Sequence, residues 1–222
     1  MLKSHLCSER SFTATNHTLC SNTANLAVIH LSTADEVLAP VVKRFGPCIV
    51  RPRRTNHFHA LANSIMSQQL SDKASETIQR RVRAKLGGNK VYKPIDFIQC
   101  DSAQLRDAGL SRAKIRYVKH LAEAVHGGRI SFADLRRQNN NAVIESLTRL
   151  PGIGMWTAEM FLIFGLGRVD VFSEGDAGLR RAIQTLYGSG KRKLSDAAAL
   201  RISKLWSPYR SIASWYLWRT LD

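Results

Sequence analysis

Apolar side chains recur at helical spacing along most of the chain. The clearest case is a segment that follows the i, i+3, i+4, i+7, i+8 pattern of an amphipathic helix: Phe58, Leu61, Ala62, Ile65 and Met66. The same periodicity predicts helices over residues 35–45, 58–66, 72–86, 102–108, 111–126, 131–137, 141–148, 155–165, 176–187, 195–205 and 208–220. Alternating strand patterns are nearly absent, and the run at 48–50 is too short to matter. The pattern therefore predicts an all-α fold.

The first 33 residues differ from the rest in composition. They are rich in Ser, Thr and Asn, which favours a polar, loosely ordered N-terminal extension over residues 1–33. Residues 34–222 hold the periodic segments, without a long linker or an internal repeat. This length is enough for one sizeable core, or for two small lobes that share a groove.

The chain is strongly basic, with 33 Lys and Arg against 17 Asp and Glu and a formal net charge of +16. Residues 1–33 hold Lys3, Arg10 and Glu9, a net charge of +1, so +15 lies on residues 34–222. The charge therefore belongs to the folded part. A polyanion partner is expected, because neutralising phosphates releases condensed counterions. A basic protein with no role on nucleic acid is the alternative that charge alone leaves open.

The cysteines give no sign of a metal site. Cys7, Cys20, Cys48 and Cys100 are scattered without a CxxC pair, so neither a structural zinc site nor an iron–sulfur cluster is expected. No stretch approaches the roughly 20 apolar residues of a membrane span, and the N-terminus lacks a continuous apolar signal core. We therefore expect no metal and no membrane partner.

The segment 148–158 carries the most chemical information. Helical periodicity ends near Thr148, and Pro151 cannot continue a helix. Gly152 and Gly154 permit positive φ angles and leave no side chain between the backbone and an approaching partner. A second helix is predicted to begin at Met155, where unpaired N–H groups of the first turn form an anion site. Such a hairpin can hold a DNA phosphate without reading sequence. An ordinary tight turn between helices fits the same residues.

Four elements together resemble one known family. The hairpin Leu-Pro-Gly-Ile-Gly-x-x-Thr-Ala at 150–158 is similar to that of the helix-hairpin-helix (HhH-GPD) DNA glycosylase superfamily, and a loop with an aspartate follows it at 169–176. Residues 65–71 resemble the Gln-Gln-Leu-Ser element of the DNA-3-methyladenine glycosylase II branch. Residues 206–213 resemble that branch's Trp-x-Pro-aromatic-Arg-Ser-x-Ala helix.

These elements occur in the family's order and span roughly residues 34–222. The resemblance implies a two-lobed helical bundle with a helix-hairpin-helix DNA-binding motif. It also assigns phosphate binding to the hairpin residues Leu150, Pro151, Gly152, Ile153, Gly154 and Thr157.

The resemblance carries the family's catalytic aspartate onto Asp176. This residue follows Gly175 at the start of a predicted helix, so an N-cap role is also expected and is compatible with catalysis. The dipole of that helix favours a carboxylate, which suits a group that faces an oxocarbenium-like sugar. Asp170 and Glu174 are the competing carboxylates, and Asp170 is expected to fix the loop instead.

A missing amine points to hydrolysis. The bifunctional glycosylase/lyases of this superfamily place a lysine where Trp156 stands here, and a lysine there would form a Schiff base with the sugar. Trp156 cannot do so, so water is the expected nucleophile. Lys73 and Lys114 are not expected to reach the site.

Aromatic residues are expected to hold the flipped base. By motif match, Trp156 and Trp218 fall where the family presents aromatic side chains, and a cationic alkylpurine stacked there gains roughly 0.5–2 kcal/mol. The family's other pocket aromatic falls on Met160, a departure that leaves the substrate range open. Trp206, Trp215 and Tyr216 are expected in the core.

Gln69 matches the position from which the family inserts a wedge into the gap that the flipped base leaves. A polar wedge can pair with the orphaned base. The alternative is a polar loop in which Gln68 and Gln69 are merely solvated.

The resemblance thus implies a monofunctional glycosylase of base excision repair that releases alkylated purines, of the 3-methyladenine and 7-methylguanine type, from damaged double-stranded DNA. Two alternatives remain: a glycosylase for deaminated or oxidised bases, and a non-catalytic protein that binds damaged DNA. No organic cofactor is implied, although related hairpins bind a monovalent cation through backbone carbonyls. We expect a monomer, located with the nucleoid in the cytoplasm of a bacterium or in the nucleus of a eukaryote.

Overall fold

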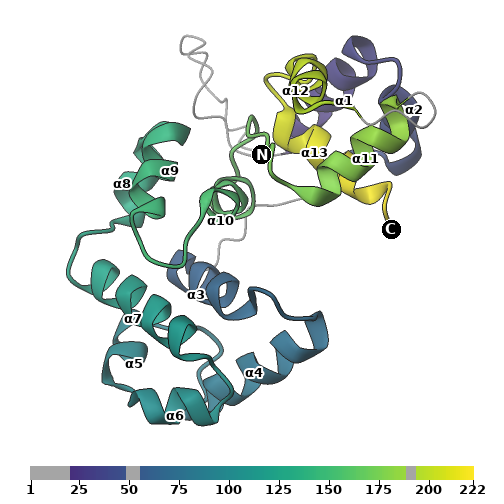
Figure 1. Cartoon of the computed structure of the whole chain (residues 1–222). Helices are drawn as coiled ribbons and strands as arrows, with labels where there is room; N and C mark the ends of the chain where they lie inside the picture. Colours follow the sequence, from purple (N-terminus) through teal and green to yellow (C-terminus); the bar gives the residue numbers. More distant parts are fainter. Residues whose placement is uncertain (1–20, 49–55, 189–193) are drawn as a thin grey trace, which may run out of the picture.

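The computed structural model describes residues 21–48, 56–188 and 194–222, and in these residues helices joined by loops are the regular structure, with no β-strand (Figure 1). The elements of this part of the chain are α1 (Ser21–Ala34), α2 (Ala39–Phe45), α3 (His57–Ser67), α4 (Asp72–Lys85), α5 (Pro94–Gln99), α6 (Ser102–Asp107), α7 (Arg112–His126), α8 (Phe132–Arg137), α9 (Asn140–Thr148), α10 (Met155–Met160), the π-helical segment η1 (Phe161–Gly165), α11 (Ala177–Tyr187), α12 (Asp196–Lys204) and α13 (Arg210–Arg219). The all-α prediction is confirmed. Within the described residues, no helix is both long and apolar enough to cross a membrane.

Two separate hydrophobic cores divide the helices into two lobes. The first core is built from α3 to η1, with Phe58, Phe97 and Leu121 among its fully buried side chains. The second is built from α1, α2, α11 and α13, around Trp206 and Tyr216. From α1 onward the chain therefore starts in the second lobe, passes through the first and returns, which brings α1 and α2 beside α11 and α13 (Figure 1).

The prediction of a loosely ordered extension is wrong for residues 21–33. These residues form α1, whose Ala24, Ala27 and Leu31 are buried, the latter two in the second core. Their i, i+3, i+7 spacing is that of one face of a helix. Because Ser, Thr and Asn surround these three apolar residues, the helix was not predicted from the sequence. Residues 1–20, and the run Cys48-Ile49-Val50 beyond Cys48, lie outside the described part of the chain.

Proline and glycine positions account for most other differences from the predicted helices. Helix α2 begins at Ala39, with Pro40 in its first turn, and α13 begins only at Arg210, after Pro208. Helix α5 was not predicted, and it starts at Pro94. The predicted helix 155–165 is α10 followed by the π-helical η1, which ends at Gly165.

A buried carboxylate fastens the N-terminal helices to the second lobe. Asp35 accepts hydrogen bonds from Trp206 Nε1 and Tyr187 Oη, both at 2.7 Å, through one oxygen. Its other oxygen accepts the amides of Val37 and Leu38 at 3.0 Å. Burial, and then the Asp35 carboxylate, raise the pKa of Tyr187, so its hydroxyl stays a donor. Trp206 is thus a core residue, as the sequence indicated.

Removal of this carboxylate is expected to destabilise the protein. Asp35→Ala leaves the buried Trp206 N–H and Tyr187 hydroxyl without an acceptor, at a cost of roughly 1–3 kcal/mol for each donor. Urea unfolding followed by circular dichroism measures this destabilisation. The neighbouring, exposed Glu36 provides the control, because Glu36→Ala is expected to change the free energy of unfolding by less than about 0.5 kcal/mol. Equal destabilisation in the two variants would contradict the role of Asp35.

Candidate active site

The predicted hairpin joins α9 to α10. Its tip is exposed, and the residues that anchor it to the first lobe are buried. Leu150 and Ile153 lie in the first core, whereas Pro151 and Gly154 are exposed. The side chain of Thr157 is also buried, so any contact of this residue with phosphate would use its backbone N–H. The hairpin therefore presents backbone rather than side chains at its tip, as the sequence predicted.

The two hairpin glycines serve different purposes. Gly152 has φ +85°, and an added Cβ would lie 2.4 Å from Cγ of Tyr117, so only glycine fits. Gly154, in contrast, has φ −89° and open space around its Cα, so the expectation of a positive φ there is wrong. Gly154 is the N-cap of α10, where the lack of a side chain leaves the first-turn N–H groups uncovered.

Asp176 lies between the two tryptophans that the sequence singled out. Its Oδ2 accepts a hydrogen bond from Trp156 Nε1 at 2.7 Å, and its Oδ1 accepts one from Trp218 Nε1 at 3.0 Å. The amide of Leu179 donates to Oδ1 at 2.7 Å, which makes Asp176 the N-cap of α11. The carboxylate thus has a fixed orientation with 7% exposure, and it makes no salt bridge with Arg180, which pairs with Asp196.

The site lies where the two lobes meet. Trp218 packs against both hydrophobic cores, and its ring lies 5.7 Å from that of Phe164, a neighbour that the sequence did not indicate. Trp156 keeps 48% of its surface exposed, so an aromatic surface beside the carboxylate is open to a ligand. Met160 is half-buried one turn after Trp156 on α10 and packs against the first core.

Gly178 gives the carboxylate and the indole room to approach each other. An added Cβ would lie 3.1 Å from Asp176 Oδ1 and 3.2 Å from Trp218 Cδ1. Sequence reasoning missed this role. Gly178 lies in the first turn of the predicted helix, and the need for a glycine there comes from Trp218, which is distant in sequence.

The competing carboxylates are engaged elsewhere or exposed. Asp170 accepts two hydrogen bonds from the Arg210 guanidinium, at 2.6 and 2.9 Å, and one from the hydroxyl of Ser207. This bidentate ion pair raises the pKa of Arg210 and fixes the loop to the start of α13, the role predicted for Asp170. Glu174 is exposed, and its backbone carbonyl accepts Arg180 Nε. Asp176 is therefore the carboxylate available at the aromatic surface.

A second buried carboxyl lies behind the site and was not predicted. Glu159 on α10 is 9% exposed, and the hydroxyl of the fully buried Ser173 donates to its Oε2 at 2.5 Å. Burial raises the pKa of Glu159, the Ser173 hydrogen bond opposes this, and Glu174 and Asp176 add to the rise. The pair connects α10 to the loop that carries Asp176. A glutamate on an otherwise apolar helix face gave the only hint of it.

The loop after α3 carries Gln69 in a left-handed conformation. Gln69 is exposed, with φ +56°, a conformation that non-glycine residues rarely adopt. Gln68 donates from Nε2 to the carbonyl of Gly152 at 2.8 Å, so it is not merely solvated. Lys114 Nζ donates to the carbonyls of Met66 and Gln68, at 2.8 and 2.7 Å. Lys114 thus caps backbone carbonyls at the C-terminal end of α3. The Gln68 hydrogen bond to Gly152 connects the loop that carries Gln69 to the hairpin.

The contrast between the hairpin glycines yields a stability prediction. Gly152→Ala is expected to lower the free energy of unfolding by about 2–4 kcal/mol, because it combines a left-handed backbone with a clash against Tyr117. Gly154→Ala is the matched control and, because Gly154 is an N-cap with open space around its Cα, is expected to lower stability by no more than about 1 kcal/mol. Thermal unfolding measures both variants. Equal stability of the two proteins would contradict the tight packing of Gly152.

Glu159 yields a pH-dependent prediction. Its raised pKa in the folded state means that folding favours the neutral form, so this contribution is complete below the ordinary value of 4.5 and is lost as pH rises through the folded pKa. Glu159→Gln keeps an acceptor for Ser173 without a charge. The melting temperature of the variant, relative to wild type, is therefore expected to increase from acidic to neutral pH. The exposed Glu36→Gln should show no such trend, and a flat difference for Glu159→Gln would refute the assignment.

Comparison with known proteins supports this reading of the geometry. Residues 62–208 match the family model described as the HhH-GPD superfamily base excision DNA repair protein. DNA-3-methyladenine glycosylase 1 of Schizosaccharomyces pombe is 35% identical over 199 residues, which cover 87% of this chain and 86% of that protein.

Solved structures give the same result. The crystal structure of a DNA-3-methyladenine glycosidase from Bacillus halodurans is similar with a TM-score of 0.80 and 39% identity, over 87% of this chain and 88% of that one. The S. pombe 3-methyladenine DNA glycosylase Mag1 in complex with abasic DNA has a TM-score of 0.76 and 34% identity, over 88% of this chain and 96% of that one. The chain belongs to the HhH-GPD superfamily of base excision DNA repair proteins, in the branch that contains the DNA-3-methyladenine glycosylases.

Proposed function

We propose that this protein is a monofunctional DNA glycosylase that hydrolyses the N-glycosidic bond of alkylated purines in damaged double-stranded DNA. The observation that carries the proposal is the carboxylate of Asp176, held by the indole N–H groups of Trp156 and Trp218 beside an exposed aromatic surface. Relatives named for 3-methyladenine point to alkylated purines as the substrates.

The chemistry asks little of the protein beyond charge and position. In a cationic alkylpurine the C1′–N bond breaks with its electron pair moving to the base, which leaves as a neutral molecule. Positive charge then develops on the sugar, and a fixed carboxylate stabilises it. Water adds to C1′ and gives up a proton, and the products are the free base and an abasic site.

Asp176 has the capacity for this role. A carboxylate offers about four lone-pair sites, and three hydrogen bonds occupy Oδ1 and Oδ2 here. Oδ2 accepts only the bond from Trp156, so it retains a site for the sugar or for the attacking water. No reorganisation of the carboxylate is needed, because both tryptophans and the N-cap bond already hold it.

The lysines support hydrolysis rather than a lyase reaction. The position that would carry a Schiff-base lysine holds Trp156, whose indole is committed to Asp176. Lys114 donates to the carbonyls of Met66 and Gln68, and burial lowers its pKa. The amine of Lys114 therefore stabilises the loop that carries Gln69, which is a structural role.

The hairpin and Gln69 supply DNA binding and base flipping in this proposal. Exposed backbone at Pro151 and Gly154, with the N–H groups of residues 155–157, suits a phosphate of the lesion strand. Gln69 lies on a loop that is hydrogen-bonded to the same hairpin. The position of the wedge relative to the phosphate contact is therefore fixed. A flipped base then stacks on Trp156, and a cationic base gains most.

Single-turnover release of free base from methylated duplex DNA tests the proposal. Wild type is expected to release 3-methyladenine, and Asp176→Asn is expected to slow the release by roughly 100-fold or more while it still binds the duplex. Glu174→Gln is the matched control, an exposed carboxylate two positions away, and should keep the wild-type rate.

Other outcomes separate the alternatives. Release of a deaminated or oxidised base instead would change the substrate class but keep the reaction. Tight binding of lesion DNA without release of any base, across a panel of lesions, would contradict the enzymatic proposal and identify a damage-binding protein.

A further inference from the structure

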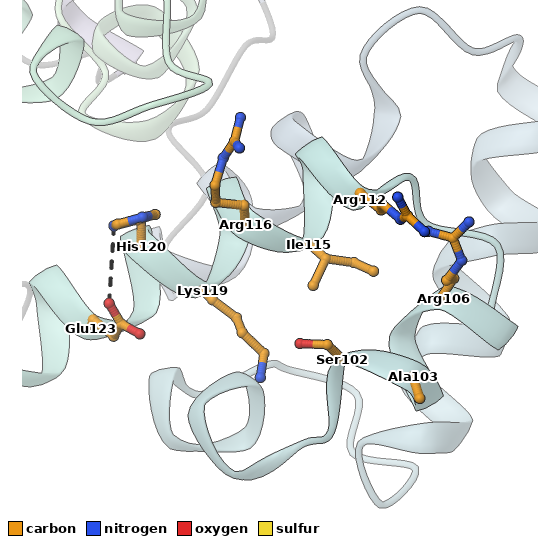
Figure 2. A pocket seen from close by; sticks show the side chains of 9 residues that line it. All are labelled: Ser102, Ala103, Arg106, Arg112, Ile115, Arg116, Lys119, His120 and Glu123. Carbon is orange, nitrogen blue, oxygen red and sulfur yellow. Dashed lines mark ion pairs between the residues drawn. The ribbon is translucent and has the colours of Figure 1, made fainter.

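A basic pocket lies on the first lobe, between α6 and α7 (Figure 2). It has a volume of about 490 Å³. Its lining in the described part of the chain consists of Ser102, Ala103, Arg106, Arg112, Ile115, Arg116, Lys119, His120 and Glu123. None of these residues contributes to the site around Asp176. The pocket is therefore a separate feature whose charge needs an explanation.

The positive charges of the pocket are not balanced by the protein. Arg106 from α6 and Arg112 from the start of α7 reach towards the same end of the pocket (Figure 2), and neither makes an ion pair with a described residue. The one lining carboxylate, Glu123, lies at the other end, 4.0 Å from His120. Lys119 donates to the carbonyl of Cys100 at 2.7 Å and retains further donors.

Packing keeps these like charges together. Leu105 and Leu110, on either side of the turn between the helices, are buried in the first core, and Ile115 forms an apolar part of the pocket wall. The two arginines therefore start from backbone positions that cannot move apart. Like charges held in one concave site repel each other unless an anion lies between them.

One residue of the pocket lining, Arg116, lies close to the hairpin. The Arg116 guanidinium lies over the Tyr117 ring, 5.5 Å from its centroid, and the same ring packs against Gly152 of the hairpin. Arg112 precedes Arg116 by one turn of α7, about 6 Å along the helix axis.

The lining also indicates which part of a nucleic acid fits. It contains four cationic side chains, a hydroxyl, the His120 imidazole and the Glu123 carboxylate, but no large aromatic platform of Phe, Tyr or Trp. Arginine forks match phosphate oxygens in bidentate geometry. The chemistry therefore favours the sugar–phosphate backbone over a base or a flat cofactor.

We propose that the pocket between α6 and α7 binds backbone phosphates of the duplex beyond the contact made by the hairpin, with Arg106 and Arg112 as the principal ligands. The inference rests on the proposed function in so far as duplex DNA is the substrate. It assigns to this surface a sequence-independent contact that extends the footprint of the protein along DNA.

The salt dependence of DNA binding tests this assignment. Affinity for an undamaged fluorescent duplex is measured by anisotropy over a range of salt concentrations, for wild type and for Arg106→Ala/Arg112→Ala. The slope of log K against log salt is expected to become less steep by about 0.9 for each phosphate that the variant no longer neutralises. The matched control is Arg201→Ala/Lys204→Ala, which removes two exposed positive charges from α12 in the other lobe.

A slope that changes no more in the pocket variant than in the control would overturn the assignment. A second result would also overturn it: the wild-type pocket binds inorganic pyrophosphate, but the salt slope of DNA binding is unchanged in the pocket variant. That result would identify a site for a free phosphate compound. Base release from methylated duplex by the wild-type protein is measured in parallel. A changed slope in a protein that releases no base would uphold the pocket and refute the glycosylase proposal.

Discussion

The carboxylate of Asp176 joins three parts of the chain that are distant in sequence. It accepts hydrogen bonds from Trp156 at the start of α10, from Trp218 near the end of α13, and from the first turn of its own helix α11. The hairpin belongs to the first lobe and the two other helices to the second. Of these three bonds, the one from Trp156 crosses between the lobes, so an interaction that orients the carboxylate also holds the hairpin against the second lobe.

Two further interactions hold the loop that delivers Asp176. Asp170 is clamped by Arg210, which fixes the beginning of the loop to α13. Ser173 is buried against Glu159, which fixes its middle to α10. The loop is thus fastened to the same two helices that supply the tryptophans. A site built in this way tolerates no independent movement of hairpin, loop or C-terminal helix, which suits a reaction that depends on a fixed charge.

The sequence predicted what local patterns determine. The family resemblance assigned roles to Asp176 and Trp156 because the hairpin, the loop and the helix start follow one another along 27 residues, from 150 to 176, and the structure brings the two residues into contact. The interactions that depend on the tertiary fold were not found. Gly178 serves a tryptophan 40 positions away, and Glu159 faces Ser173 only in the folded chain. The apolar stripe of α1 is too narrow among polar residues to predict a helix without the core that covers it. Local patterns therefore give little sign of most residues whose partners are distant.

The most direct test of the central claim compares two duplexes that the protein cannot cleave, one with a cationic pyrrolidine in place of the target sugar and one with a neutral abasic analogue. If the Asp176 carboxylate stabilises positive charge at the sugar, wild type binds the cationic duplex more tightly, and Asp176→Asn abolishes this preference while it keeps affinity for the neutral duplex. An equal preference in wild type and variant would show that the charge is stabilised elsewhere and would contradict the account.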